Sequence, residues 1–272
     1  MTVTADRPLV LVGGGKMGCA LLGGWLADGL DGAAVMVIDP SPPNDLARTI
    51  ADAPVSVHSA PPAGLTPSVL LLAIKPQMMA AVLPTLAPLV APDTLSISIA
   101  AGTPIATLEA GLGGGAIVRV MPNTPALVGR GVNVCVGNLK VGETQRAVVD
   151  RLMAAVGSVS WIDDEALMDA VTGVSGSGPA YIFLLAECLA QAGIDAGLPA
   201  DLAEKIARET VTGAGELLHR SPEKAETLRK NVMSPGGTTV AALEVLMAED
   251  GLQPLLTKAV AAATRRSKEL AG

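Results

Sequence analysis

The chain has 272 residues, of which 50% are hydrophobic, so it can build one large domain or two modest ones, each with its own core. Aromatic residues make up only 1%, so we expect that core to be aliphatic. A net charge of −7 argues against a nucleic-acid partner, and the unbroken apolar runs are far shorter than the ~20 residues of a membrane span.

The cysteines and histidines do not suggest a metal site or a disulfide framework. Cys19, Cys135 and Cys188 are widely spaced and form no CxxC pair, and the chain has only two histidines. Asp6 and Arg7 interrupt any apolar run that could act as a signal peptide. We therefore expect no metal, no membrane partner and a reducing, cytoplasmic setting.

A glycine-rich turn near the N-terminus is the most informative stretch. Residues 9–12 are an apolar run typical of a buried parallel strand, and helical spacing begins after the turn. The turn matches G-x-G-x-x-G, whose glycines permit a tight turn, approach of a pyrophosphate and close helix packing. The alternative is a glycine-rich turn without a ligand. We predict a dinucleotide site that includes Gly13, Gly14, Gly15, Lys16, Met17 and Gly18.

Strands and helices alternate through the first part of the chain. Further strands are predicted at residues 35–38, 55–57, 69–74, 94–99, 116–121, 133–136 and 158–161. Helices are predicted at residues 45–51, 78–89, 103–110 and 143–155. We expect Pro84 to break the second of these helices, and Thr103 to cap the third with Pro104 in its first position. The alternation predicts an α/β fold with a parallel, doubly wound, Rossmann-type sheet.

Asp39 ends the second strand, about 20 residues after Gly18, where a dinucleotide fold places the acid that reads the ribose. A carboxylate there accepts from a ribose 2′-hydroxyl and repels a 2′-phosphate. No arginine follows before Arg48. By this reasoning Asp39 favours NADH over NADPH.

The strand pattern stops near Trp161, and only helices are predicted beyond it. We expect a dinucleotide domain over residues 1–162 and an all-helical domain over residues 163–272. The helix at residues 179–190 is apolar on nearly every side but too short to span a membrane, so we expect it to be buried. Either an obligate dimer or the first domain would have to cover it.

Four stretches together resemble the pyrroline-5-carboxylate reductases, which make proline. They are AIKPQ at residues 73–77, MPNTP at 121–125, AVTGVSGSGPA at 170–180 and MSPGGTT at 233–239. The resemblance implies hydride transfer from NAD(P)H to L-1-pyrroline-5-carboxylate, a helical dimerisation domain, and a homodimer or an oligomer of dimers. This family is usually described as using NADPH, in tension with Asp39, so we expect both cofactors to be used.

The substrate carboxylate needs an anion site. Glycines and threonines at a helix start offer N–H groups and hydroxyls, although such a segment is also an ordinary loop with an N-cap. The resemblance assigns substrate binding to Gly236, Gly237, Thr238 and Thr239, with Ser234 beside them and Thr239 and Ser234 in the catalytic set. It assigns further cofactor contacts to Ala73, Ile74, Lys75, Pro76, Ala100, Ala101, Asn123 and Asn231, although Lys75 alone would suit a solvated loop.

Glu165 is a second candidate for the substrate site. Together with Asp163 and Asp164 it forms an acidic cluster that would ordinarily be a solvated helix start. The resemblance implies instead that Glu165 lies near the imine nitrogen, and it places Glu165 in both the substrate-binding set and the catalytic set. No histidine or lysine is an obvious general acid, so we expect the imine to arrive protonated or to take its proton from water.

Two other functions fit parts of the pattern. A β-hydroxyacid dehydrogenase or another imine reductase also joins a glycine turn to a helical domain, but the former usually carries a lysine on its central helix. Residues 179–192 contain none. A non-enzymatic redox sensor would bind a dinucleotide without needing the anion site at residues 234–239.

Overall fold

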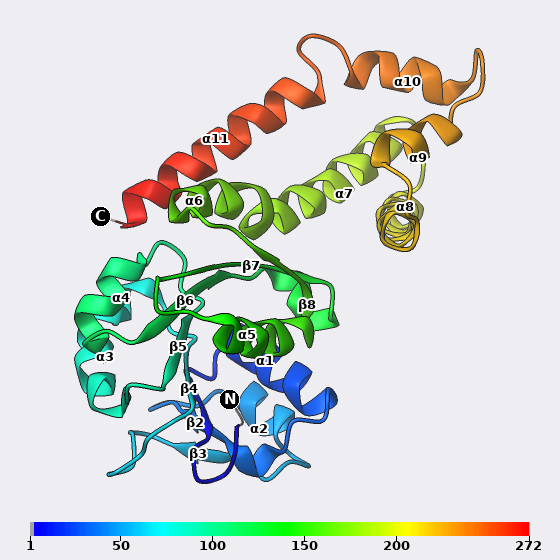
Figure 1. The fold of residues 1–272 in the computed structure, drawn as a ribbon. Helices are drawn as coiled ribbons and strands as arrows, with labels where there is room; N and C mark the ends of the chain where they lie inside the picture. The colour runs from blue at the N-terminus through cyan, green and yellow to red at the C-terminus, as the bar shows by residue number, and fades with distance from the viewer. Residues whose placement is uncertain (1–2, 272) are drawn as a thin grey trace. The chain divides into compact units, whose positions relative to one another are not determined.

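The computed structural model of the protein describes residues 3–271 (Figure 1). These residues form two compact units. The first unit runs to Gly176 and also contains the chain from Ala263 onward, and the second comprises Ser177–Ala262. A functional boundary between residues 162 and 163 remains a prediction.

The first unit is built on an eight-stranded sheet with the order β3-β2-β1-β4-β5-β6-β7-β8. The six strands from β1 to β6 are parallel, as predicted. The strands are β1 (Leu9–Val12), β2 (Val35–Ile38), β3 (Ser56–His58), β4 (Val69–Leu72), β5 (Leu95–Ser98), β6 (Ala116–Met121), β7 (Gly131–Gly137) and β8 (Gly157–Trp161). The strand order reverses between β1 and β4, which is where ligands bind in open α/β sheets.

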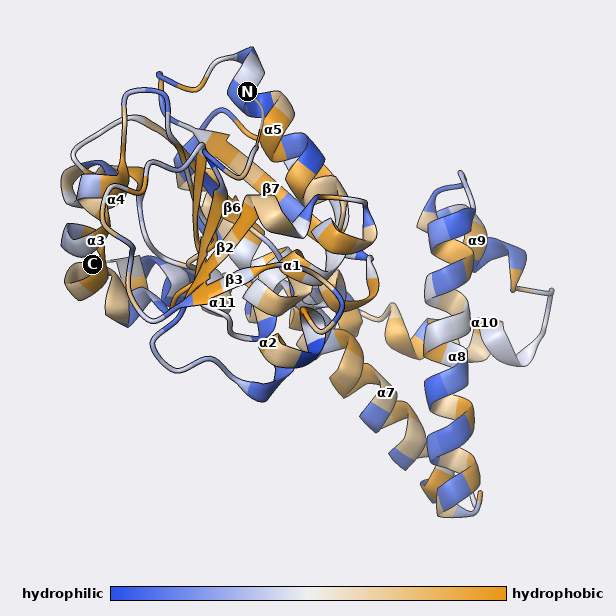
Figure 2. Ribbon diagram, turned by 90° about the horizontal axis from the view of Figure 1, so that it is seen from below, coloured by the Kyte–Doolittle hydropathy of each residue, from blue (hydrophilic) through white to orange (hydrophobic). Residues whose placement is uncertain are grey.

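Helices cover both faces of this sheet, and the central strands are therefore buried and apolar on both sides (Figure 2). One face packs against α1 (Lys16–Ala27), α2 (Asn44–Thr49) and α5 (Glu143–Ala154). The other packs against α3 (Met79–Leu86) and α4 (Ile105–Leu112). Short helical turns complete the unit: η1 (Gly32–Ala34), η2 (Pro76–Met78), η3 (Ala87–Leu89), η4 (Thr124–Val128), η5 (Glu165–Leu167), α6 (Met168–Val171) and the π-helix η6 (Thr172–Gly176).

The prediction of an all-parallel sheet is wrong at one edge. β7 runs antiparallel to β6, and β8 is parallel to β7. A parallel crossover needs about a dozen residues or more, whereas residues 122–130 link β6 to β7 with only the short turn η4. The reversal pairs Met121, at the end of β6, with Val134 in the middle of β7.

Two helix predictions are also wrong. Pro84 lies inside α3 without breaking it, because Pro84 is exposed while Met79, Leu83 and Leu86 hold the other side in the core. Thr103 does not cap α4: the N-cap is Pro104, the helix begins at Ile105, and no local side chain caps it. A distant side chain, that of Glu165, accepts from the Ile105 N–H instead.

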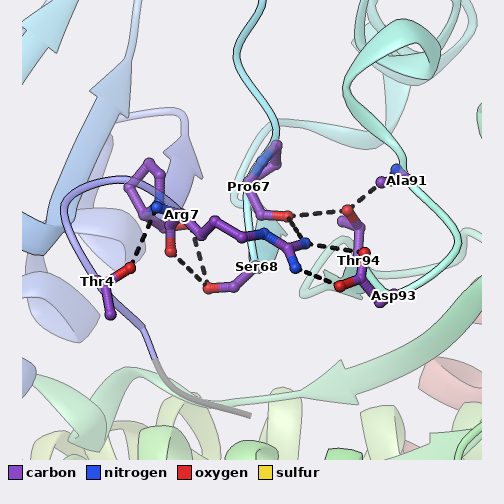
Figure 3. Close-up of polar contacts among 8 residues, drawn as sticks. Thr4, Arg7, Pro67, Ser68, Ala91, Asp93 and Thr94 are labelled. Atoms are coloured by element: carbon purple, nitrogen blue, oxygen red, sulfur yellow. Dashed lines mark hydrogen bonds and ion pairs between the residues drawn. The ribbon is translucent and has the colours of Figure 1, made fainter.

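A polar clamp holds the amino ends of three strands together, at the opposite edge from the glycine turn (Figure 3). Arg7, just before β1, forms an ion pair with Asp93 and donates to the carbonyl of Pro67 over 3.3 Å. The Ser68 hydroxyl donates to the Arg7 carbonyl over 2.9 Å, and the Thr94 hydroxyl donates to Pro67 over 2.8 Å. The clamp therefore connects β1 with the residues that precede β4 and β5.

The remaining elements are helices, as predicted beyond Trp161. They are α7 (Gly178–Asp195), α8 (Ala200–Arg220), α9 (Ala225–Asn231), α10 (Thr238–Leu246) and α11 (Leu252–Ala271). Within the second unit α7 packs against α8. From Ala263 onward, α11 belongs to the first unit, where the Ser267 hydroxyl donates to Asp169 of α6 over 2.6 Å.

The expected burial of the apolar helix is not met within one chain. Among the described residues of α7 only Ala190 is buried, and the exposed side chains include Ile182, Phe183, Leu184, Leu185 and Leu189. The prediction that this helix is too short to span a membrane is wrong, because it lies in the helical stretch Glu165–Asp195, which is long and apolar enough to cross one by length and composition alone. Such an apolar surface requires a partner, and a second copy of the chain is one that would serve.

Candidate active site

The glycine turn between β1 and α1 has the geometry of a dinucleotide loop. Gly13 has a φ of +100°, and a Cβ added to it would lie 2.6 Å from the carbonyl oxygen of Ala73. A Cβ at Gly18 would lie 2.2 Å from the carbonyl oxygen of Gly13. A Cβ at Gly15, by contrast, would meet nothing within 4 Å. Two glycines therefore permit close packing, and the third leaves the backbone open to a pyrophosphate.

The start of α1 is also open. Its N-cap is Gly15, which has no side chain to accept from the first-turn N–H groups. Lys16 and Met17 are the first residues of the helix, and Lys16 is exposed. N–H groups in this position can donate to phosphate oxygens at the positive end of the helix dipole. The turn and the helix start thus fit a dinucleotide.

Asp39 lies at the end of β2 beside this turn. Its Oδ2 accepts from the Gly14 N–H over 2.7 Å, and its Oδ1 accepts from the Ser41 N–H over 2.8 Å. The predicted ribose-reading acid therefore also fixes the glycine turn, which sequence reasoning missed. Each carboxylate oxygen keeps acceptor capacity for a ribose hydroxyl.

Other predicted cofactor residues follow the two strands next to β1. Ala73 and Ile74 follow β4, with the Ala73 N–H donating to Val12 over 2.8 Å. Lys75 is exposed and occupies the N-cap position of η2, which begins at Pro76. After β5 come Ala100, which is buried, and Ala101. All of these residues lie at the carboxyl edge of the parallel strands, where the glycine turn also lies.

Asn123 connects two of the family-like motifs. Its Nδ2 donates to the carbonyl and the hydroxyl of Ser175, each over 3.2 Å, and its Oδ1 accepts from the Val132 N–H over 2.9 Å. A Cβ at Gly176 would lie 2.4 Å from the Met121 side chain, so η6 and the end of β6 pack closely. Asn123 thus holds β6, β7 and η6 together, and its cofactor contact remains a prediction.

Glu165 is engaged within the first unit. Its Oε1 accepts from the Arg119 guanidinium and from the Ile105 N–H, both over 2.9 Å. The Arg119 side chain is 6% exposed, and that of Glu165 is 30% exposed. Sequence reasoning missed Arg119, although a charged residue between Val118 and Val120 in a buried strand was a signal.

The second unit contains the predicted anion site at the start of α10. Gly236 has a φ of +70°, and the Gly237 N–H donates to the Ser234 carbonyl over 2.9 Å. The N-cap is Gly237, and no side chain caps the helix. The first-turn N–H groups of Thr238 and Thr239 have no partner inside a helix that starts there. Ser234 and Thr238 are exposed, and Thr239 is half-buried. This arrangement fits a carboxylate.

Asn231, another predicted cofactor residue, ends α9 and is exposed. Its Nδ2 donates to Glu223 Oε2 over 3.2 Å. Sequence reasoning did not single out Glu223, because an exposed acid before a helix is typical of a solvated surface.

The cysteines do not provide a reactive thiol in the sheet unit. Burial raises the pKa of Cys19, and burial raises the pKa of Cys135 to about 12, so neither is a thiolate at neutral pH. Cys188 is exposed on α7. Over residues 3–271 no group of three or more metal-ligating side chains comes together.

A glycine turn of this geometry on a Rossmann-type sheet is typical of dinucleotide-dependent oxidoreductases. Residues 8–102 match the family model described as "NADP oxidoreductase coenzyme F420-dependent". Residues 165–270 match the one described as "Pyrroline-5-carboxylate reductase dimerisation".

Individual relatives cover nearly the whole chain. The pyrroline-5-carboxylate reductase of Pseudomonas aeruginosa is 40% identical over 265 residues, 97% of this chain and 96% of that protein. The solved structure of a Coxiella burnetii pyrroline-5-carboxylate reductase is 34% identical with a TM-score of 0.91, covering 98% and 99% of the two chains. A Plasmodium falciparum reductase with NADP bound is 29% identical with a TM-score of 0.80, covering 99% and 100%. The chain belongs to the pyrroline-5-carboxylate reductase family, and its helical part is the family's dimerisation domain.

Proposed function

We propose that this protein reduces L-1-pyrroline-5-carboxylate to L-proline with NADPH or NADH, the last step of proline biosynthesis. The observation that carries the proposal is the pairing, in one chain of this family, of an open glycine turn with an uncapped helix start at Gly237. The first suits a pyrophosphate and the second suits the carboxylate of a small imino acid.

When bound, the nicotinamide supplies a hydride, which adds to the imine carbon while the ring nitrogen takes a proton. The protein's contribution is to bind and orient. The N–H groups and hydroxyls of Thr238 and Thr239 hold the substrate carboxylate, with Ser234 beside them. The proton arrives on the imine or from water, so positioning provides most of the rate.

That Glu165 lies at the imine nitrogen remains a prediction, and its observed contacts suggest a different role. Its Oε1 already accepts from Arg119 and from the N–H of Ile105. A carboxylate oxygen that already accepts from two donors is better suited to holding the structure than to binding a substrate.

We further propose that the active form is a homodimer or an oligomer of dimers in the cytoplasm. The exposed apolar side chains of α7 support it, since a second copy would cover them. In such an assembly Asn231 of one chain would reach the cofactor bound by the other. The free cysteines, two of them buried, suit a reducing compartment.

The test is NAD(P)H oxidation by the purified protein, followed by absorbance with each dinucleotide. Oxidation should require added pyrroline-5-carboxylate. A β-hydroxyacid dehydrogenase would instead respond to an aldehyde or ketone acid, and a redox sensor would bind dinucleotide without turning over. Dinucleotide binding with no oxidation in the presence of pyrroline-5-carboxylate would refute the proposal.

A further inference from the structure

Arg119 is a buried cation that the proposed chemistry does not use. It lies on β6, and its guanidinium donates to Glu165 Oε1 over 2.9 Å. A buried charge is tolerated when it is paired, and removing the partner is costly. The ion pair therefore fixes the Glu165 carboxylate against the sheet.

The same carboxylate oxygen also holds the start of α4. It accepts from the N–H of Ile105, the first residue of that helix, over 2.9 Å. The N-cap of α4 is Pro104, and no local side chain caps the helix. Glu165, 60 residues away in sequence, therefore supplies both an acceptor and a negative charge at the positive end of α4.

The start of α4 is also the end of the loop that leaves β5. This loop, residues 99–104, contains Ala100 and Ala101. At its beginning the Ile99 N–H donates to Leu72 of β4 over 3.1 Å. At its end the next residue, Ile105, donates to Glu165. The loop is therefore held at one end by a neighbouring strand and at the other by the Glu165 carboxylate.

We propose that Arg119 and Glu165 are positioning residues for the dinucleotide: the carboxylate that Arg119 holds fixes the start of α4 and so fixes the loop of residues 99–104 at the cofactor edge of the sheet. The inference rests on the proposed dinucleotide site, which that loop borders. In this role Glu165 touches neither the imine nor the hydride.

The test compares Glu165→Gln with the wild-type protein in two measurements that need no turnover. Titration of intrinsic fluorescence with NADPH or NADH gives the dissociation constant. We expect it to rise about tenfold, the order of effect that loss of one charge-assisted hydrogen bond produces. Hydrogen exchange of the cofactor-free protein should show faster exchange of the Ile105 amide. In turnover, KM for the dinucleotide should rise by a larger factor than KM for pyrroline-5-carboxylate.

Asp163→Asn is the matched control, because it removes one charge from the same acidic cluster at an exposed position. It should leave the dissociation constant unchanged. A Glu165→Gln protein with unchanged cofactor affinity but a raised KM for pyrroline-5-carboxylate would overturn the inference and restore Glu165 to the substrate site. A lowered unfolding temperature with unchanged affinity and unchanged KM would overturn it too, since the pair would then serve stability alone.

Arg119→Gln tests whether the two residues act as a unit. If Arg119 works through Glu165, the double variant should lose no more cofactor affinity than the more impaired single variant. If the affinity losses of the two single variants multiply in the double variant, the two residues act independently and the inference is contradicted. Should wild-type protein bind NADPH but fail to oxidise it with pyrroline-5-carboxylate, the proposed function fails while these affinity comparisons remain decisive for the positioning role.

Discussion

The carboxylate of Asp39 has one observed task and one predicted task. It accepts from the backbone N–H groups of Gly14 and Ser41, and it is the group that a ribose 2′-hydroxyl would meet. The contacts with the two N–H groups favour binding of either dinucleotide, because they shape the glycine turn. The second task disfavours a 2′-phosphate because like charges repel. A substitution that separates these tasks is therefore more informative than one that removes both.

Asp39→Asn should change cofactor preference while keeping the turn. The amide oxygen can still accept one backbone N–H, whereas the negative charge is gone. We expect the ratio of kcat/KM for NADPH to kcat/KM for NADH to rise about tenfold, equivalent to ~1.4 kcal/mol, through both better NADPH use and poorer NADH use. Asp39→Ser, which is too short to reach both N–H groups, should lower kcat/KM with both cofactors. An unchanged ratio in Asp39→Asn would mean that Asp39 does not face the ribose.

Alanine substitutions at Gly15 and Gly18 distinguish the packing of the glycine turn from the approach of the cofactor to it. Gly18→Ala places a Cβ 2.2 Å from the Gly13 carbonyl oxygen, so it should lower the unfolding temperature markedly. Gly15→Ala meets nothing within 4 Å, so it should lower the unfolding temperature by only about 2–4 °C, the cost of replacing glycine by alanine at an N-cap. Its Kd for NADPH should nevertheless rise at least tenfold, because the new methyl group stands where the pyrophosphate approaches. Equal affinities for Gly15→Ala and the wild type would place the pyrophosphate elsewhere.

At the element scale, strands were predicted better than the contacts at their ends. Apolar runs such as Val35–Ile38 were predicted with correct bounds because burial on both faces leaves a local signature. The reversal of β7 was missed, since it depends on the length of a link rather than on composition. The cap of α4 was missed for a different reason: its acceptor is Glu165, and no local pattern reveals a partner so far along the chain. The ends of the strands were therefore predictable, whereas the contacts that support the loops after them were not.

The clamp at the amino ends of the strands makes a pH-dependent prediction. The Arg7 guanidinium lowers the pKa of Asp93 in the folded protein. A lowered folded-state pKa adds stability that is present above the ordinary aspartate pKa of about 3.9 and is lost as the pH falls through the folded value. The Asp93→Asn protein lacks this contribution. We expect it to unfold at a lower temperature than the wild type near pH 6, with the difference shrinking below about pH 4.

Thermal unfolding between about pH 2.5 and pH 7 checks this expectation. Asp52→Asn is the control, since it removes an equal charge from an exposed turn. The difference in unfolding temperature between Asp52→Asn and the wild type should not shrink below about pH 4 as it does for Asp93→Asn. If the difference in unfolding temperature between Asp93→Asn and the wild type grows as the pH falls, the prediction is wrong, because a paired carboxylate loses its stabilising effect in acid.

At the scale of the whole molecule, the sheet unit has its own apolar core, whereas α7 leaves Phe183 62% exposed in one chain. Leucines at 184 and 185 extend this surface. Such a surface on a dimerisation domain is what a second copy would bury. The sequence predicted an apolar helix that has to be buried. Whether a partner chain or the first domain buries it could not be predicted from a local pattern.

Phe183→Glu should therefore convert the protein to a monomer, because a charge at the centre of an apolar interface is costly to bury. Sedimentation velocity at micromolar concentration measures the change. The monomer should retain the far-ultraviolet circular dichroism of a folded sheet unit but lose pyrroline-5-carboxylate-dependent NADPH oxidation, since Asn231 would no longer reach a partner's cofactor. Leu139→Glu is the matched control: Leu139 is fully exposed after β7, outside the helical part, so this variant should remain oligomeric and active. A Phe183→Glu protein that sediments like the wild type would exclude this face of α7 from the interface, and a fully active monomer would exclude a site shared between chains.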